Sequence, residues 1–235
     1  MTDPGTSGDG ERWADAHRPG AGHGRGDRDR LLVAVVDYGA GNLVSIDQAL
    51  TTVGADVRIA KRPAALEDAA ALVVPGVGAA GPAMRRLARG GLLDAILAWI
   101  AVGRPYLGIC LGLQLLFEGS DEDGSSTFGV LPGRVQRLRD APTLPHIGWN
   151  QVEQRCQHPL FAGIPSGTDL YFVHSYAGVP APVAADTVLA VTTHGGTFPS
   201  AVAQGNIVGV QFHPERSGPD GLRLLANFVA WAGGR

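Results

Sequence analysis

Three short apolar runs, each leading into a turn or a helical pattern, constrain the fold of this chain more than any other feature. They are LLVAVVD (residues 31–37), ALVVP (71–75) and PYLGIC (105–110). Continuous runs of this kind are typical of strands buried on both faces of a parallel sheet. Apolar residues at helical spacing follow the first run, in residues 42–53, and a shorter strand is predicted at 56–60. The first half therefore predicts a doubly wound α/β sheet with helices on both faces.

The pattern changes after residue 117. Short strands separated by Gly, Pro and Asp turns predict antiparallel hairpins added to the edge or face of the sheet. Helices are expected at 82–89, 92–102 and 221–231. One domain with a mixed sheet, residues 31–235, is the expected organisation. The predicted strands of the second half are GRVQRL, HIGWNQV, TDLYFVHSYAG, VLAVTTHG, PSAVAQ and NIVGVQFHPE.

Residues 1–30 are rich in Gly, Asp and Arg and lack apolar periodicity, which predicts a disordered N-terminal extension. Its GAGHGRG run is no candidate phosphate loop, because no strand precedes it and no helix follows. The 19 Lys+Arg against 22 Asp+Glu leave a net charge of −3, which argues against nucleic acid or an anionic membrane as partner. Cys110 and Cys156 form no disulfide framework, and neither a membrane span nor a secretory leader is evident. A cytoplasmic location is therefore expected.

The most informative motif is Gly108-Ile109-Cys110-Leu111-Gly112, at a predicted strand-to-helix turn. It has the form glycine, any residue, nucleophile, any residue, glycine, with cysteine as the nucleophile. The turn brings the two glycines close together and lifts the thiol clear of the sheet. The start of the following helix favours the thiolate. A buried structural cysteine is the alternative, and Cys156, which has no such turn, is interpreted in that way.

A cysteine nucleophile needs a base, and the base needs a group that fixes its tautomer. Among seven histidines, only His213 follows an apolar strand and has an acidic residue two positions away, Glu215. Residues i and i+2 of extended backbone project to the same side, so Glu215 can accept a hydrogen bond from His213. A surface pair at the end of a strand is the alternative. We interpret His213 and Glu215 as the base and its orienting group.

Residues 76–81 (GVGAAG) match a dinucleotide-binding fingerprint, after a predicted strand and before a predicted helix. The next strand ends in Cys110 and not in an acidic residue that could bind a ribose, which argues against that interpretation. The same loop could present a backbone N–H to a developing negative charge, opposite the N–H of Leu111. The loop is therefore a candidate for half of an oxyanion hole.

Together these motifs resemble the class I (triad) glutamine amidotransferases, whose signature is a G-x-C-x-G turn and a distant H-P-E. Within that family the chain is most similar to the glutaminase subunits of imidazole glycerol phosphate synthase. The resemblance covers about residues 31–235. It is carried by DYGAGNL (37–43), PGVG (75–78), GICLGLQLLFEGS (108–120), PHIGWN (145–150), YFVHSY (171–176) and FHPERSG (212–218).

The resemblance implies a flavodoxin-like fold, the class I glutamine amidotransferase domain, and hydrolysis of L-glutamine to glutamate and ammonia, with no metal or other cofactor. Cys110 would attack the side-chain amide, His213 would move the proton and Glu215 would orient His213. Arg216 stands where lysine is common in the family. The positions matching the oxyanion hole are Leu111 and Val77, those matching the substrate site are Gly78, Gln114, Ser175 and Tyr176, and those matching the partner interface are Asn42, Trp149 and Tyr171.

The implied partner is a separate (β/α)₈-barrel cyclase subunit, in a heterodimer that uses the ammonia to form imidazole glycerol phosphate and AICAR in histidine biosynthesis. Three alternatives remain at this point. The chain could be a glutaminase for anthranilate, aminodeoxychorismate or another acceptor, which PHIGWN argues against. It could be a non-catalytic α/β binding module that has kept the turn as scaffolding. It could also be a cysteine peptidase or a related hydrolase with a similar turn.

Overall fold

The computed structural model describes residues 30–234, so nearly all of the predicted extension at residues 1–30 lies outside the described residues. A nine-stranded mixed sheet forms the centre of the molecule, in the order β2-β1-β3-β4-β12-β11-β10-β7-β8. The first five strands of that order are parallel and the rest are antiparallel. The parallel strands are β1 (Leu32–Val36), β2 (Asp56–Ala60), β3 (Ala71–Val74), β4 (Tyr106–Ile109) and β12 (Ile207–Val210).

Four of the parallel strands, β1, β3, β4 and β12, are apolar throughout because both of their faces are covered, whereas the edge strand β2 contains Asp56 and Arg58. In β1, Val33 and Val35 belong to the core on one face of the sheet, whereas Ala34 and Val36 belong to the core on the other. All four residues are fully buried. The alternation of faces along a strand thus accounts for a continuous apolar run without polar interruptions. The predicted doubly wound arrangement is confirmed.

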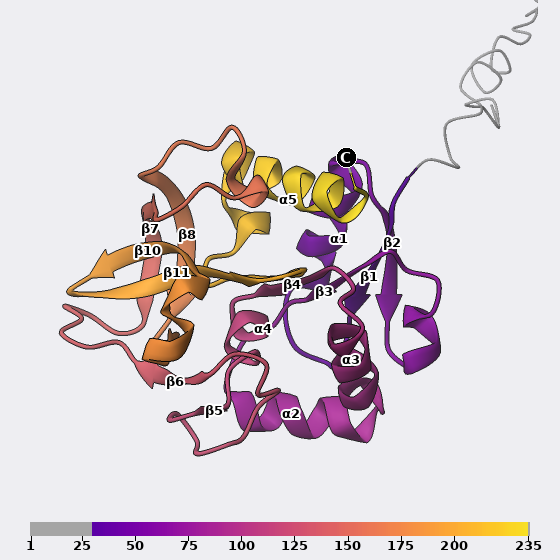
Figure 1. The fold of residues 1–235 in the computed structure, drawn as a ribbon, viewed down its shortest axis with the longest axis horizontal. Coiled ribbons are helices and arrows are strands. Elements are labelled where there is room, and N and C mark those ends of the chain that lie inside the picture. Colours follow the sequence, from indigo (N-terminus) through magenta and orange to yellow (C-terminus); the bar gives the residue numbers. More distant parts are fainter. Residues whose placement is uncertain (1–29, 235) are drawn as a thin grey trace, which may run out of the picture.

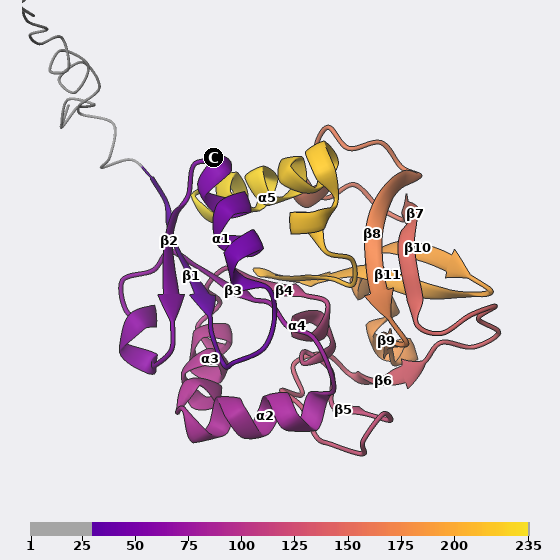
Figure 2. The same ribbon diagram turned by 180° about the vertical axis from the view of Figure 1, so that it is seen from behind.

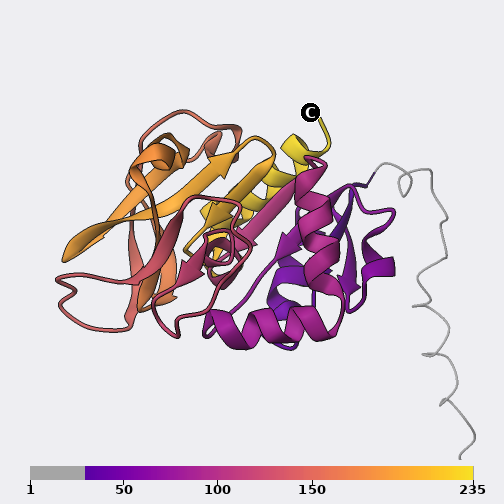
Figure 3. The same ribbon diagram turned by 60° about the horizontal axis from the view of Figure 1, so that its bottom comes forward.

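Helices cover the two faces in pairs (Figures 1 and 2). α1 (Leu43–Thr52) and α5 (Gly218–Ala232) contact each other on one face. α2 (Ala80–Arg89) and α3 (Leu92–Ala101) pack together on the other, as Figure 3 shows from below. The helix after β4, α4 (Leu111–Gln114), is a single turn and is entirely buried. No helix within residues 30–234 is long and apolar enough to cross a membrane.

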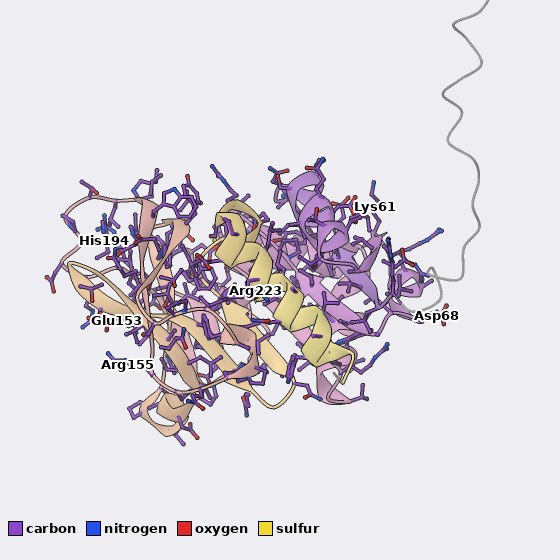
Figure 4. The ribbon with its side chains drawn as sticks, turned by 90° about the horizontal axis from the view of Figure 1, so that it is seen from above. Lys61, Asp68, Glu153, Arg155, His194 and Arg223 are labelled. Carbon is purple, nitrogen blue, oxygen red and sulfur yellow. The ribbon has the colours of Figure 1, made fainter. Side chains whose placement is uncertain are left out.

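The second half of the chain builds the antiparallel part of the sheet, as predicted. Two long hairpins extend it beyond β12, and Figure 4 shows them on the opposite side of α5 from the parallel strands, with His194 and Glu153 on the hairpins and Lys61 on the parallel side. The hairpin strands are β7 (His146–Gln154), β8 (Thr168–His174), β10 (Val188–His194) and β11 (Gly196–Gln204).

One predicted strand proves to be two, which is a correction. The segment TDLYFVHSYAG breaks at Ser175, where β8 ends and β9 (Tyr176–Pro180) begins. β8 pairs with β7 in the large sheet, whereas β9 pairs with β6 (Gly133–Arg137) in a separate three-stranded sheet completed by β5 (Gly119–Ser120). A continuous strand-like sequence cannot reveal that its two halves have different partners, because pairing is decided by distant segments.

Candidate active site

Cys110 lies between β4 and α4 in a strained turn. Its backbone has φ 54° and ψ −106°, in the left-handed region that non-glycine residues rarely adopt. A Cβ atom on Gly108 would lie 2.4 Å from the carbonyl oxygen of Gly112, and one on Gly112 would lie 1.7 Å from that of Val74. The two glycines are thus required by the close approach of backbone to backbone, as the motif predicts. The Cys110 side chain is nearly buried.

His213 comes beside this turn because β12 pairs directly with β4. Gly209 is opposite Gly108, and the amide of Cys110 donates to the carbonyl of Val210 at 2.8 Å. After β12 a backbone hydrogen bond fixes the position of His213, whose N–H donates to the carbonyl of Tyr171 at 2.8 Å. Neighbouring parallel strands therefore deliver two residues that are far apart in sequence to the same end of the sheet.

His213 and Glu215 form the predicted pair. Nδ1 of His213 donates to Oε1 of Glu215 at 2.8 Å, and both side chains are almost completely buried. Burial by itself lowers the pKa of His213, but the interactions with Cys110 and with Glu215 outweigh it and raise that pKa from 6.5 to about 10. His213 is thus an imidazolium at neutral pH. Its Nε2 is buried and makes no hydrogen bond, which leaves this nitrogen available for proton transfer.

The backbone N–H of Leu111, the predicted oxyanion donor, already has a hydrogen-bond partner. It donates to the carbonyl of Gly76 at 3.4 Å, so the loop after β3 fills the position that an oxyanion would take. The other predicted donor, Val77, belongs to the same loop, and its side chain is half-exposed. The structure therefore brings the loop that contains Val77 against Leu111, the residue after Cys110.

Tyr38, which sequence analysis did not single out, holds this loop. Its hydroxyl donates to the carbonyl of Pro75 at 3.1 Å, and a Cβ atom on Gly76 would lie 2.0 Å from the hydroxyl oxygen. Burial, and then the proximity of Cys110, raise the pKa of Tyr38, so it remains a neutral donor. Its position in DYGAGN, directly after the first strand, was the available signal.

The predicted substrate residues fall into two groups. Gln114 and Tyr176 are joined, since Nε2 of Gln114 donates to the carbonyl of Tyr176 at 2.8 Å. Ser175 is the junction between β8 and β9 directly before Tyr176. Gly78, with φ 87°, lies instead in the loop after β3, so it borders the site from the parallel side of the sheet.

Two of the predicted partner residues, the exposed Trp149 and the half-buried Tyr171, form an aromatic pair near His213. Trp149 of β7 is opposite Tyr171 of β8, and their rings meet edge to face with centroids 6.1 Å apart. The guanidinium of Arg216 lies over the Tyr171 ring at 4.2 Å. Trp149 is 57% exposed, and Ile147 beside it is 60% exposed. This surface is apolar, and the Arg216 contact connects it to the loop that holds His213.

Asn42, the third predicted partner residue, has a structural role of its own. Its side chain accepts a hydrogen bond from the N–H of Ser45 at 3.3 Å and caps α1. It lies at the start of α1, which contacts the turn Pro214–Arg216, and Arg216 of that turn lies over the Tyr171 ring.

The glycine-rich loop at 76–81 is not arranged to bind a dinucleotide. The N–H of Gly81, at the start of α2, already donates to the Asp123 carboxylate at 2.7 Å. A phosphate at this helix end would have to displace a carboxylate that occupies its position. Within residues 30–234, no group of three or more His, Cys, Asp or Glu side chains could hold a metal ion.

Comparison with known proteins gives matches over most of the chain. A family profile described as "Glutamine amidotransferase class-I" matches residues 34–231. The chain is 51% identical over 197 residues to "Imidazole glycerol phosphate synthase subunit HisH" of Symbiobacterium thermophilum, covering 83% of this chain and 92% of the relative. It is 47% identical to the protein of the same name from Microcystis aeruginosa, covering 84% and 94%.

Solved structures support the fold alone. One described as "Crystal structure of glutamine amidotransferase" superposes with a TM-score of 0.66 at 24% identity, over 86% of this chain and 98% of that one. Another, described as "Structure of PurLQS from Thermotoga maritima", gives a TM-score of 0.69 at 19% identity, over 86% and 99%. The mixed sheet and its helices are thus shared with proteins whose sequences have diverged widely.

Proposed function

The chain belongs to the class I glutamine amidotransferases, in the family of imidazole glycerol phosphate synthase HisH subunits, and we propose that Cys110, His213 and Glu215 are the triad with which it hydrolyses glutamine. The observation that carries the proposal is the buried His213–Glu215 pair, whose imidazolium is stabilised by Cys110 at a strained strand-to-helix turn. A surface ion pair would be solvated and would not be coupled to a cysteine from another strand.

The chemistry follows from these positions. The thiolate of Cys110 attacks the side-chain amide carbon of glutamine, and the C–S bond forms while the carbonyl electrons move to oxygen. His213 donates its Nε2 proton to the amide nitrogen, so the C–N bond breaks and ammonia leaves a thioester on Cys110. Nε2 then takes a proton from water, which attacks the thioester and releases glutamate. Glu215 keeps the proton on Nδ1 throughout, so that Nε2 is the nitrogen that exchanges protons.

Catalysis also requires two backbone donors for the oxyanion, the amides of Leu111 and Val77. Since the Leu111 N–H is bound to the Gly76 carbonyl, the loop after β3 must rearrange before the oxyanion is stabilised. We therefore expect the isolated chain to hydrolyse glutamine slowly. The amino-acid end of the substrate is assigned to Gln114, Tyr176 and the neighbouring Gly78 and Ser175.

The proposed partner is the cyclase subunit of the synthase, a (β/α)₈ barrel that consumes ammonia to form imidazole glycerol phosphate and AICAR. The exposed Trp149 and Ile147, with the half-buried Tyr171, would provide an apolar docking surface beside the triad, and Asn42 would lie at its edge. Docking at this position would exclude water from the site and give ammonia a protected exit.

The test reconstitutes the synthase from this chain and the purified cyclase. The Cys110→Ala variant should lose synthesis from glutamine and retain synthesis from added ammonium salts, whereas Cys156→Ala should retain both. Synthesis from glutamine by the Cys110→Ala complex would contradict the triad assignment.

A further inference from the structure

Gln211 is a fully buried polar residue that the proposed chemistry does not use. Its Nε2 donates to the sulfur of Cys110 at 3.5 Å, while its Oε1 accepts from Nε2 of Gln114 at 3.1 Å. The second contact fixes the orientation of the amide, because only Oε1 can accept. The N–H₂ group is thereby directed at the sulfur.

The hydrogen-bond chain continues from Gln114 to a histidine. Gln114 also donates to the carbonyl of Tyr176, which accepts a second hydrogen bond from Nδ1 of His174 at 2.9 Å. A carbonyl only accepts, so His174 carries its proton on Nδ1 and its Nε2 is an acceptor. Nδ1 of His146, at 3.2 Å from that Nε2, must then be the donor.

The last members of the chain lie on β7. Nε2 of His146 accepts from the side-chain N–H₂ of Asn150 at 3.1 Å, and the same group donates to the carbonyl of Thr193 at 3.0 Å. Both histidines are buried, and burial lowers the pKa of His146 to about 4 and that of His174 to about 3. Every proton of the chain is therefore determined, and both rings are neutral.

Packing holds the histidines in this arrangement. The ring of His194, which Figure 4 shows on the antiparallel side of the molecule, stacks on His146 with centroids 4.1 Å apart. Phe172 stacks on the other side at 5.0 Å, and Phe198 contacts His174 at 5.0 Å. Neither histidine can turn to another partner without displacing an aromatic ring.

We propose that Gln211 is a positioning residue that orients the Cys110 sulfur, and that the His146–His174 pair holds Gln211 in place through this chain of hydrogen bonds. The inference rests on the proposed role of Cys110 as nucleophile. A donor on the sulfur stabilises the thiolate and selects one side-chain rotamer, so the attacking lone pair stays aligned. The chain of hydrogen bonds ends at Asn150, the residue that follows Trp149 on β7.

The first test removes the donor. Gln211→Leu keeps the volume and loses the hydrogen bond, so iodoacetamide should alkylate Cys110 roughly 10-fold more slowly at pH 7, because hydrogen bonds to charged groups have about this effect. Cys156, which is exposed, is the internal control. Ser200→Ala is the matched variant: the Ser200 carbonyl binds the Gln211 amide, but its buried hydroxyl makes no hydrogen bond. Its alkylation rate should match that of the unmodified chain.

The second test addresses the histidines. His174→Asn retains a donor near the position of Nδ1 and should keep most of the alkylation rate of Cys110. His174→Leu has no donor there, so its alkylation rate should fall about as far as that of Gln211→Leu. The double variant His174→Leu/Gln211→Leu should be no slower than either single variant, because both break one chain. Losses that multiply in the double variant would overturn the proposed link.

The third measurement is spectroscopic and uses neither glutamine nor a partner. Nitrogen-15 chemical shifts at pH 7 should show His146 and His174 protonated on Nδ1. Protonation on Nε2 in either ring, or a Gln211→Leu variant that is folded and alkylates at the unmodified rate, would overturn the proposal. Failure of glutamine hydrolysis alone would refute the proposed function and leave the positioning role of Gln211 standing.

Discussion

The backbone N–H of Leu111 donates to the carbonyl oxygen of Gly76, so the loop after β3 occupies the position in which an oxyanion would bind. Tyr38 anchors the same loop through Pro75. Two hydrogen bonds thus hold this loop against the nucleophile turn, and if the proposed function is right, weakening either one should make it easier for the loop to free the Leu111 N–H.

Tyr38→Phe removes the anchor and retains the ring. We expect the isolated chain to release glutamate a few-fold faster, because a lost neutral hydrogen bond of about 1 kcal/mol favours rearrangement of the loop. Glutamate release without a partner measures the effect. Thr187→Val is the control, since it also deletes a buried hydroxyl donor to a carbonyl, far from the site, and should leave the rate unchanged. A slower Tyr38→Phe variant would contradict the role of Tyr38 as an anchor.

The backbone conformation of Cys110 predicts that glycine at this position is more stable than alanine, which reverses the usual order of the two residues. At φ 54°, glycine is unstrained whereas alanine is not, so Cys110→Gly should unfold with a free energy about 1 kcal/mol above that of Cys110→Ala. Urea unfolding of the two variants checks this difference. Cys156 does not have a positive φ, so there the glycine variant should be no more stable than the alanine variant. If Cys110→Gly were no more stable than Cys110→Ala, the turn at Cys110 would not be strained.

The charge of His213 depends on Cys110. Burial lowers the pKa of His213, and the interactions with Cys110 and Glu215 together outweigh it and raise that pKa to about 10 in the intact chain, so loss of the Cys110 contribution in Cys110→Ala should lower it. Nitrogen-15 NMR at pH 8 should show an imidazolium in the first protein and a neutral ring in the second. A neutral His213 in the unmodified chain at pH 8 would contradict the coupling.

The buried histidines predict sensitivity to acid. Their pKa values, about 4 for His146 and about 3 for His174, lie below the 6.5 of an unfolded chain. The unfolded state therefore binds more protons below pH 6.5, and the free energy of unfolding should fall as the pH drops from 6.5 toward 4. The expected slope is roughly 1.4 kcal/mol per pH unit for each histidine. Urea unfolding of the His146→Asn/His174→Asn variant should show a shallower slope, and an equal slope would contradict the prediction.

The parallel half and the nucleophile turn were predictable because local sequence determines them. The run that forms β1 is apolar at every position because both of its faces are covered. Gly108 and Gly112 lie where two backbone segments approach so closely that only glycine fits. The pairing of His213 with Glu215 follows in the same way from the two-residue repeat of extended backbone. These features need no knowledge of distant contacts.

Other features depend on tertiary pairing and left only weak traces in the sequence. The break at Ser175 arises because β8 and β9 join different sheets. Gln211 precedes His213 by two residues, so the same repeat could have placed it at the site, but a glutamine in an apolar strand has no distinctive chemistry until its partners are known. The hydrogen bond from the Leu111 N–H to the Gly76 carbonyl depends on the conformation of the loop after β3, which the identity of its residues does not specify.

The adjacency of β4 and β12 has a consequence for how such enzymes diversify. The chain leaves the sheet after the nucleophile turn, builds both hairpins and the small sheet, and returns to the strand position next to the one it left. The register of Gly108 opposite Gly209 keeps the strand that leads to Cys110 beside the strand that leads to His213. Those parts of the excursion that contact neither His213 nor Gln114 can be lengthened or shortened without moving the two strands, so the surface offered to an acceptor enzyme can change while the hydrolytic centre is kept.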